Sequence, residues 1–206
     1  MNLTSRRKNL KKIYEPIGIA LAKTHLTPNI ITVISIIFGS LSAFYFYHKE
    51  PLIGAILLFF SGFFDLMDGV VARENDKSSK FGAVFDWLAD KFVDGVILFS
   101  IGLAYTNPFL TVLAVVSNML HTFIKPVVYA EIGFEERKKG KINDPLEGIG
   151  FFGRPETLLS IIIFSILDYF KILDLKFGFL FITVLTILSL LQRIFYLYRR
   201  YNKDYD

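Results

Sequence analysis

The sequence contains no cysteine. This absence excludes disulfide bonds, thiolate catalysis and a cysteine-ligated zinc site. Histidine is scarce, with three residues that lie far apart in the chain, and this scatter does not favour a histidine metal centre. The sequence also lacks a glycine-rich phosphate-binding loop, an RNA-binding motif and an internal repeat. We therefore expect no nucleic-acid partner.

Apolar residues dominate the composition of the chain. They make up 53% of the 206 residues, aromatic residues account for 16%, and the mean hydropathy is +0.47. The chain is too apolar for an ordinary soluble domain and long enough for about six membrane spans of roughly 20 residues each. The composition predicts an all-α, polytopic membrane protein with six transmembrane helices, folded as one domain over residues 1–206.

Proline and charged residues separate six apolar runs, which define a membrane domain over residues 29–198. We expect helices at 29–48, from 51 onward, at 81–105, at 108–131, at 155–170 and at 177–198. The second run has 13 uncharged residues between Pro51 and Asp65, too few to cross a bilayer. That helix must continue through the aspartates, which places them at the inner edge of the hydrocarbon.

Residues 1–24 are basic and lack the long apolar core of a secretory signal. Their apolar residues recur at helical intervals, at Leu10, Ile13, Tyr14, Ile17 and Leu21. This periodicity predicts an amphipathic juxtamembrane helix on the cytoplasmic membrane face. A disordered basic leader is the alternative interpretation.

The distribution of lysine and arginine predicts the orientation. In the six-span arrangement, 18 of these residues fall on the side that holds both termini, whereas Lys49, Lys171 and Lys176 fall on the other side. Positive residues accumulate on the cytoplasmic side of membrane proteins. We therefore expect a multi-pass protein of the cell membrane with its termini and its active site in the cytoplasm. The net charge of +4 then serves to attract anionic headgroups and anionic substrates.

Four aspartates lie on the second and third expected helices. Asp65 and Asp68 are three residues apart and Asp86 and Asp90 are four apart, so each pair occupies one helix face. A carboxylate at membrane depth costs several kcal/mol unless a cation compensates it. If the two helices are antiparallel neighbours joined by the polar turn 74–80, all four acids face one cleft. Their oxygens suit Mg²⁺ or Mn²⁺, as one ion or two.

Small and basic residues accompany these acids. Gly69 and Gly82 have no side chains and let phosphates approach the backbone, Ala72 continues the face of the first acid pair, and Arg73 adds a fixed positive charge. Acids, a divalent metal, small residues and an arginine together describe a site for a pyrophosphate.

The stretch 65–90 has the pattern D-x2-D-G-x2-A-R-x8-G-x3-D-x3-D, with all eight fixed residues present. It resembles the signature of the CDP-alcohol phosphotransferases, also called CDP-alcohol phosphatidyltransferases, which are integral membrane enzymes of phospholipid synthesis. The stretch Thr27-Pro28-Asn29 is similar to the start of the first transmembrane helix in that family. The resemblance implies metal-dependent transfer of a phosphatidyl-type group from a CDP-alcohol to an alcohol, with release of CMP. It also implies a homodimer.

The same resemblance implies roles for individual residues. The metal is expected to be bound by Asp65, Asp68, Asp86 and Asp90, and Asp90 is also expected to be the general base that takes the acceptor hydroxyl proton. The nucleotide is expected to bind at Asp68, Gly69, Ala72, Arg73 and Gly82. Asp94 continues the second acid stripe but lies outside the motif, and we expect it to be a structural partner of a lysine or arginine.

The acceptor is expected to be a polyol phosphate such as inositol phosphate, bound by Lys125 and Arg154. A phosphate needs arginine or lysine donors, and Arg154 with Glu156 resembles the Arg-x-Glu that begins the fifth span in members using inositol phosphate. The fourth span departs from those members, because it reads Lys125-Pro-Val-Val-Tyr129-Ala-Glu131 where they have a tyrosine followed by closely spaced basic residues and a glutamate. The basic run 137–139 is either part of this pocket or a solvated loop.

A lipid, CDP-archaeol or CDP-diacylglycerol, is the expected donor. A di-inositol phosphate phosphate synthase, which would use soluble CDP-inositol at the same site, is the first alternative. A cation transporter, in which the acids bind ions in transit, is an alternative of another class. A transporter would be expected to place its acids near the membrane midplane, and Arg73 would repel a cation.

Overall fold

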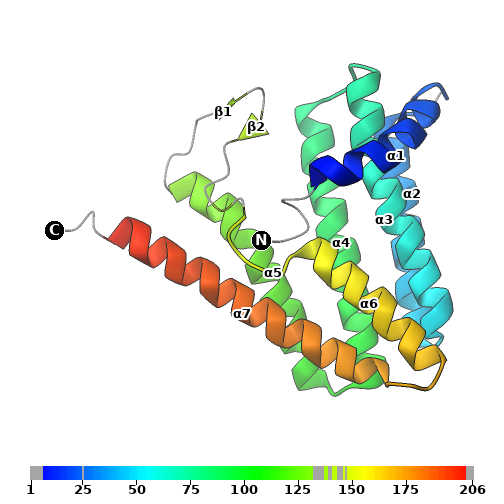
Figure 1. Ribbon diagram of the computed structural model, residues 1–206, viewed down its shortest axis with the longest axis vertical. Helices are drawn as coiled ribbons and strands as arrows, with labels where there is room; N and C mark the ends of the chain where they lie inside the picture. The colour runs from blue at the N-terminus through cyan, green and yellow to red at the C-terminus, as the bar shows by residue number, and fades with distance from the viewer. Residues whose placement is uncertain are drawn as a thin grey trace.

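The computed structural model describes residues 7–24, 26–131, 137–138, 141–142, 146 and 148–202. It contains the helices α1 (Arg7–Ala22), α2 (Pro28–Tyr47), α3 (Pro51–Glu74), α4 (Lys80–Tyr105), α5 (Pro108–Glu131), α6 (Arg154–Tyr169) and α7 (Leu175–Tyr201). Two short antiparallel strands, β1 (Arg137–Lys138) and β2 (Lys141–Ile142), lie between α5 and α6 (Figure 1). The prediction of an all-α fold is confirmed apart from this pair of two-residue strands.

Local signals explain where the helices begin. Proline occupies the first position of α2, α3 and α5, where its missing amide hydrogen removes no helical hydrogen bond. Thr27 caps α2 by accepting a hydrogen bond from the Ile30 amide. Ser79 caps α4 by accepting one from the Gly82 amide at 2.9 Å. The second cap starts α4 directly beside the motif residue Gly82.

Four of the described helices, α2, α3, α5 and α7, are long and apolar enough to cross a membrane, whereas the sequence predicts six spans. Charged residues in the first half of the 26-residue helix α4 interrupt its apolar character. α6 has 16 residues, or about 24 Å of helix, which is less than the roughly 30 Å of hydrocarbon. α3 runs unbroken from Pro51 to Glu74, so the prediction that it continues through the aspartates is confirmed.

α2 is the helix that joins the two acid-bearing helices. In the described part of the chain, α3 and α4 both pack mainly on α2, and their acids nevertheless meet, because Asp65 of α3 lies within 4.8 Å of Asp86 and Asp90 of α4. A Cβ added at Gly39 would lie 2.6 Å from the Val93 side chain, and glycine therefore allows α2 and α4 to approach closely. On the α3 side, Ser35 and Ser61 each donate a 2.9 Å hydrogen bond to the other's backbone carbonyl.

The remaining helices complete the bundle. Phe46, Ile97, Ile161 and Phe179 bring α2, α4, α6 and α7 into one buried apolar core. α7 contacts α4, α5 and α6, and its C-terminal part extends away from the other helices (Figure 1). α1 packs on α3 and lies across the end of the bundle where α3 connects to α4 (Figure 1). This end carries the four aspartates of the motif, near the end of α3 and in the first half of α4.

Candidate active site

A cavity of about 180 Å³ lies between the start of α2, the end of α3 and the start of α4. Its wall includes all five residues expected to bind the nucleotide, together with one further acid: Asp68, Gly69, Ala72, Arg73, Gly82 and Asp86. The turn between α3 and α4 adds Lys77, Ser78 and Ser79. Backbone amides, hydroxyls and two cationic side chains therefore surround a space next to buried carboxylate, a combination suited to a phosphorylated ligand with a bound cation.

Asp68 is the buried acid of this cavity. Asp68 is 4% exposed, and its carboxylate accepts a hydrogen bond of 2.5 Å from the Thr32 hydroxyl. Because this bond fixes the carboxylate, α2 determines how Asp68 faces the cavity. Thr32 lies outside the aspartate motif, and no role was predicted for it. Its position one helical turn after Pro28, close to the Thr27-Pro28-Asn29 stretch that resembles the family, is the signal that could have identified it.

The two motif glycines keep the cavity open. A Cβ at Gly82 would lie 3.0 Å from the Ser79 hydroxyl and 3.5 Å from the Asn29 side-chain oxygen. A Cβ at Gly69 would lie 3.4 Å from a terminal nitrogen of Arg73, and the Arg73 side chain itself is exposed. Side chains at either glycine would occupy space along the wall, which a ligand phosphate could otherwise use.

Three of the four predicted metal ligands come together. Asp65, Asp86 and Asp90 each present one carboxylate oxygen within 4.8 Å of the others. Oxygens that share one Mg²⁺ or Mn²⁺ lie about 2.1 Å from the ion and therefore about 3 to 4 Å from one another. Small side-chain shifts would bring all three oxygens into one coordination sphere, so these residues fit a divalent cation. Asp68 lies outside this group and shares the cavity wall with Asp86.

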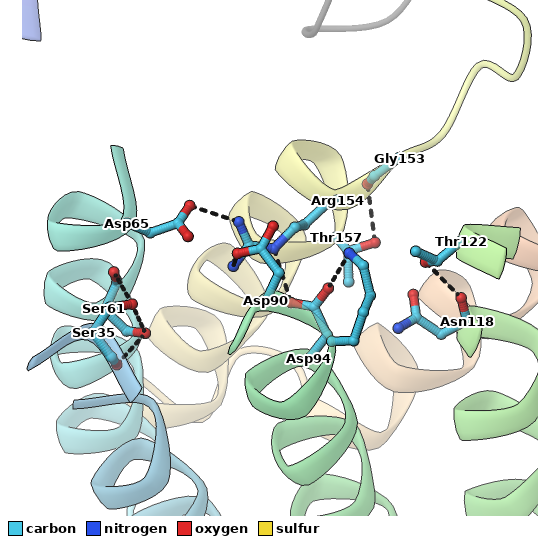
Figure 2. Close-up of polar contacts among 11 residues, drawn as sticks. Ser35, Ser61, Asp65, Asp90, Asp94, Asn118, Thr122, Gly153, Arg154 and Thr157 are labelled. Atoms are coloured by element: carbon cyan, nitrogen blue, oxygen red, sulfur yellow. Dashed lines mark hydrogen bonds and ion pairs between the residues drawn. The ribbon is translucent and has the colours of Figure 1, made fainter. Parts of the chain in front are cut away.

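Arg154, at the start of α6, contacts acids that lie between 60 and 89 residues earlier in the chain (Figure 2). Its Nη1 lies 2.7 Å from Asp65 Oδ2, its Nη2 lies 2.9 Å from Asp90 Oδ1, and its Nε donates to Asp94 Oδ1 at 3.1 Å. Lys91 Nζ is 3.7 Å from the other oxygen of Asp94. The prediction that Asp94 is a structural partner of a basic residue is confirmed.

The two residues expected to bind the acceptor lie on different helices. The Arg154 guanidinium extends along the acids, so it neutralises part of their charge and stands at the edge of the metal-ligand group. Lys125 lies partly buried on α5, a helix that supplies none of the carboxylates. The run 137–139 includes residues outside those that the structure describes.

Asp86 connects the two parts of the site, because it lines the cavity and belongs to the carboxylate group. A pyrophosphate in the cavity would therefore be next to a cation held by the acids. Asp90 belongs to the same acid group, is not among the residues that line the cavity, and lies beside Arg154. The site thus has two parts. The cavity has room and donors for a nucleotide, and Arg154 with Asp90 beside it could meet a second substrate.

Comparison with known proteins agrees with this geometry. The family model of the CDP-alcohol phosphatidyltransferases matches residues 25–198. The archaetidylinositol phosphate synthase of Pyrococcus horikoshii is 29% identical over 194 residues, which cover 94% of this chain and 95% of that protein. The phosphatidylinositol phosphate synthase of Mycobacterium tuberculosis is 25% identical over 202 residues, with 91% of this chain and 87% of the relative covered.

A solved structure shares the fold. The crystal structure of the Mycobacterium tuberculosis phosphatidylinositol phosphate synthase with CDP-DAG bound aligns with a TM-score of 0.72 at 24% identity, over 91% of this chain and 94% of the other. The match to the family model extends over most of the chain and includes the whole aspartate motif. The apolar helices described above agree with membrane enzymes of this kind. The chain therefore belongs to the CDP-alcohol phosphatidyltransferase family and is a multi-pass membrane transferase.

Proposed function

We propose that this enzyme transfers a phosphatidyl-type group from a lipid CDP-alcohol, CDP-archaeol or CDP-diacylglycerol, to a hydroxyl of a polyol phosphate such as inositol phosphate, with release of CMP. One observation carries the proposal: the five residues expected to bind the nucleotide line one cavity, and Asp86 of that cavity also belongs to the group of three acids. The reacting pyrophosphate would lie where these two features meet.

The names of the relatives support the choice of substrates. One relative that aligns with nearly the whole chain is an archaetidylinositol phosphate synthase, and another is a phosphatidylinositol phosphate synthase. The solved structure with the same fold contains CDP-DAG, a lipid donor. Both names describe a lipid group joined to an inositol phosphate, which matches the proposed donor and acceptor classes.

Mg²⁺ or Mn²⁺ is the proposed cofactor, held by Asp65, Asp86 and Asp90, with Asp68 as a further ligand if two ions bind. A second solved structure of the mycobacterial synthase contains manganese and citrate, which supports a divalent cation in this fold. When bound, such an ion would neutralise the pyrophosphate and stabilise the departing CMP. The protein supplies the position of the reactants, which is the main requirement for phosphoryl transfer.

The residues of the chain then have distinct tasks in the proposed reaction. Gly69, Ala72 and Gly82 let the nucleotide lie against the backbone, and Arg73 contacts its phosphates. The acceptor oxygen attacks the phosphorus that carries the lipid, the bond from this phosphorus to the CMP oxygen breaks, and Asp90 takes the proton of the acceptor hydroxyl. Arg154 lies beside Asp90 and is proposed, with Lys125, to bind the phosphate of the acceptor.

We further propose six membrane spans, formed by α2 to α7, in one domain. α4 carries its charged residues in the half next to the motif and is apolar from Gly95 onward, which suits a helix whose acids lie at the cytoplasmic edge. The excess of lysine and arginine at that end supports cytoplasmic termini and a cytoplasmic site. A homodimer is proposed from the resemblance to the family alone.

A soluble donor is the second candidate. The bifunctional IPC transferase and DIPP synthase of Archaeoglobus fulgidus is 29% identical over 182 residues, and the match covers 88% of this chain but 36% of that longer protein. A CDP-inositol donor would use the same cavity and the same acids. Membership in a transferase family gives no support to the alternative of a cation transporter.

CMP release by the purified protein in detergent tests the proposal. Each of CDP-archaeol, CDP-diacylglycerol and CDP-inositol is combined with inositol phosphate, glycerol 3-phosphate, serine or inositol, in the presence of Mg²⁺ or Mn²⁺. We expect release with a lipid donor and inositol phosphate. Release with CDP-inositol alone would establish the soluble-donor alternative, and no release with any pair would contradict the proposed reaction.

A further inference from the structure

The acids and Arg154 come from α3, α4 and α6, yet two polar residues of α7 are buried against the segment just before Arg154. Ser189 is 0% exposed and Arg193 is 5% exposed. A polar group that is removed from water normally has hydrogen-bond partners that compensate its desolvation. Those partners show what the two side chains hold in place.

Ser189 holds both backbone groups of Phe152. Its hydroxyl donates to the Phe152 carbonyl at 2.9 Å, and its oxygen accepts from the Phe152 amide at 3.4 Å. His121 Nε2, on α5, lies 3.1 Å from the same oxygen. Because the single hydroxyl proton goes to Phe152, His121 is the donor in the third bond. Ser189 thus fixes a residue that stands two positions before Arg154.

Arg193 binds the same segment and connects it to α5 through two hydrogen bonds. Its Nε donates to the Ile149 carbonyl at 3.0 Å, and its Nη1 donates to the His121 carbonyl at 2.6 Å. Gly150 has a φ of +97°, and a Cβ there would lie 2.7 Å from Arg193 Nε and 2.9 Å from Ser189 Oγ. The backbone therefore passes directly over both side chains, at a point where glycine is required.

The segment leads straight into the site. Gly153 follows Phe152 and is the N-cap of α6, and its amide donates to Glu156 Oε2 at 3.0 Å. Arg154 is the next residue, and its guanidinium contacts three carboxylates. A displacement of Phe152 would reach Arg154 through one intervening residue, without a flexible linker to absorb it.

We infer that Ser189 is a positioning residue for the acceptor site: by fixing Phe152 it sets where Arg154 stands relative to Asp65 and Asp90. The inference rests on the proposed function in that Arg154 is taken to orient the phosphate of the acceptor. It gives α7 a task in the reaction although no described residue of this helix lines the cavity or belongs to the group of three acids.

A double-mutant cycle tests this inference. The proteins compared are wild type, Ser189→Ala, Arg154→Ala and the double variant, with Arg154→Lys in place of Arg154→Ala if the latter does not fold. Ser42→Ala is the matched control, because Ser42 is also 0% exposed and donates one interhelical bond of 2.7 Å, to the Gly54 carbonyl. CMP release is measured while acceptor and donor are titrated separately, and the unfolding midpoint of each protein is measured in detergent.

The inference predicts a selective effect on the acceptor. Ser189→Ala should raise the acceptor KM about tenfold, since a small misplacement of a positioning group has an effect of this order or larger. The donor KM should stay within about twofold, and Ser42→Ala should leave both KM values unchanged. When Arg154 is already removed, Ser189→Ala should add less than about a twofold further effect, because the two residues act as a unit.

Two results would overturn the inference. The first is an acceptor KM that Ser189→Ala leaves unchanged, as Ser42→Ala is expected to do. The second is a double variant whose change in acceptor KM equals the product of the changes caused by Ser189→Ala and Arg154→Ala. If the wild-type protein releases no CMP with any substrate pair, the proposed function fails, and the unfolding midpoints alone decide the inference. Midpoint shifts that are smaller in the double variant than the sum of the single shifts then support the coupling, and additive shifts contradict it.

Discussion

Two acids of the motif have different neighbours, and this difference separates their tasks. Asp86 lines the cavity that is proposed to bind the nucleotide and also belongs to the carboxylate group. Asp90 belongs to the same group but is not among the residues that line the cavity, and it is paired at 2.9 Å with Arg154, the residue proposed to bind the acceptor. One residue is thus suited to hold a cation near the pyrophosphate, and the other is suited to receive a proton from the acceptor hydroxyl.

Replacing Asp90 with asparagine tests the general base. Asp90→Asn keeps the shape of the side chain and an amide oxygen that can still coordinate the proposed cation, but it removes the ability to take a proton, so turnover should fall by about 10²-fold or more. Binding of the CDP donor, measured by calorimetry with Mn²⁺ present, should change by less than about threefold, because the cavity wall stays intact.

Asp168→Asn is the control for this substitution. Its carboxylate lies at the other end of α6, where it accepts a hydrogen bond from the Leu175 amide at 3.3 Å. The control should keep full turnover. An Asp90→Asn protein with unchanged turnover would remove Asp90 from the role of base.

At the scale of the helices, α2 is the element that joins the two halves of the motif. It packs on α3 through the reciprocal Ser35 and Ser61 bonds and on α4 through Gly39. It also supplies Thr32, which holds Asp68. The cavity is therefore formed by three helices, although the motif itself lies on two.

The packing of α2 on α4 can be tested with a pair of glycine substitutions. Gly39→Ala would place a Cβ 2.6 Å from Val93 Cγ1, and overpacking of this kind typically lowers the free energy of unfolding by about 1–3 kcal/mol. Gly62→Ala is the control, because the nearest atom to its Cβ, on Leu158, lies at an ordinary 3.7 Å.

Alanine in a helix is more stable than glycine by about 0.5–1 kcal/mol where space allows. Gly62→Ala should therefore be neutral or stabilising, and Gly39→Ala should be destabilising, when both are unfolded by an increasing fraction of denaturing detergent. Equal behaviour of the two variants would show that α2 and α4 do not approach closely at Gly39.

The sequence predicts local features well and long-range contacts poorly, for physical reasons. Proline and capping residues act on their own turn, so the helix starts follow from the chain itself. The pairing of Arg154 with Asp65 joins residues 89 positions apart, and no periodicity or spacing connects them. The place of α2 between α3 and α4 depends on the fit of small residues such as Gly39 across an interface, which a single sequence does not encode as a visible pattern.

For the molecule as a whole, the arrangement of the helices puts the candidate site at one end. α1 lies across the end where α3 connects to α4, and the turn between α6 and α7 lies at the opposite end (Figure 1). In the proposed orientation the first end is cytoplasmic, where anionic substrates and cationic side chains meet. The second end then faces the outside of the cell.

The absence of cysteine makes this orientation testable by labelling. Glu74→Cys places the single thiol at the end of α3, and Ile172→Cys places it in the turn after α6, where Ile172 is 70% exposed. In intact cells, a membrane-impermeant maleimide should label Ile172→Cys but not Glu74→Cys. Both should react after the cells are permeabilised, and the reverse pattern in intact cells would contradict a cytoplasmic site.

The measurement that tests the central claim most directly is CMP release as a function of divalent cation, in wild type and in Asp86→Asn. The account predicts no release when the cation is removed by EDTA, recovery when Mg²⁺ or Mn²⁺ is added back, and a loss of about 10²-fold or more in Asp86→Asn at saturating cation, as for other metal ligands whose loss disables a site. Release that continues in EDTA, or that Asp86→Asn leaves unchanged, would contradict the claim that the acids and the cavity form one metal-dependent transfer site.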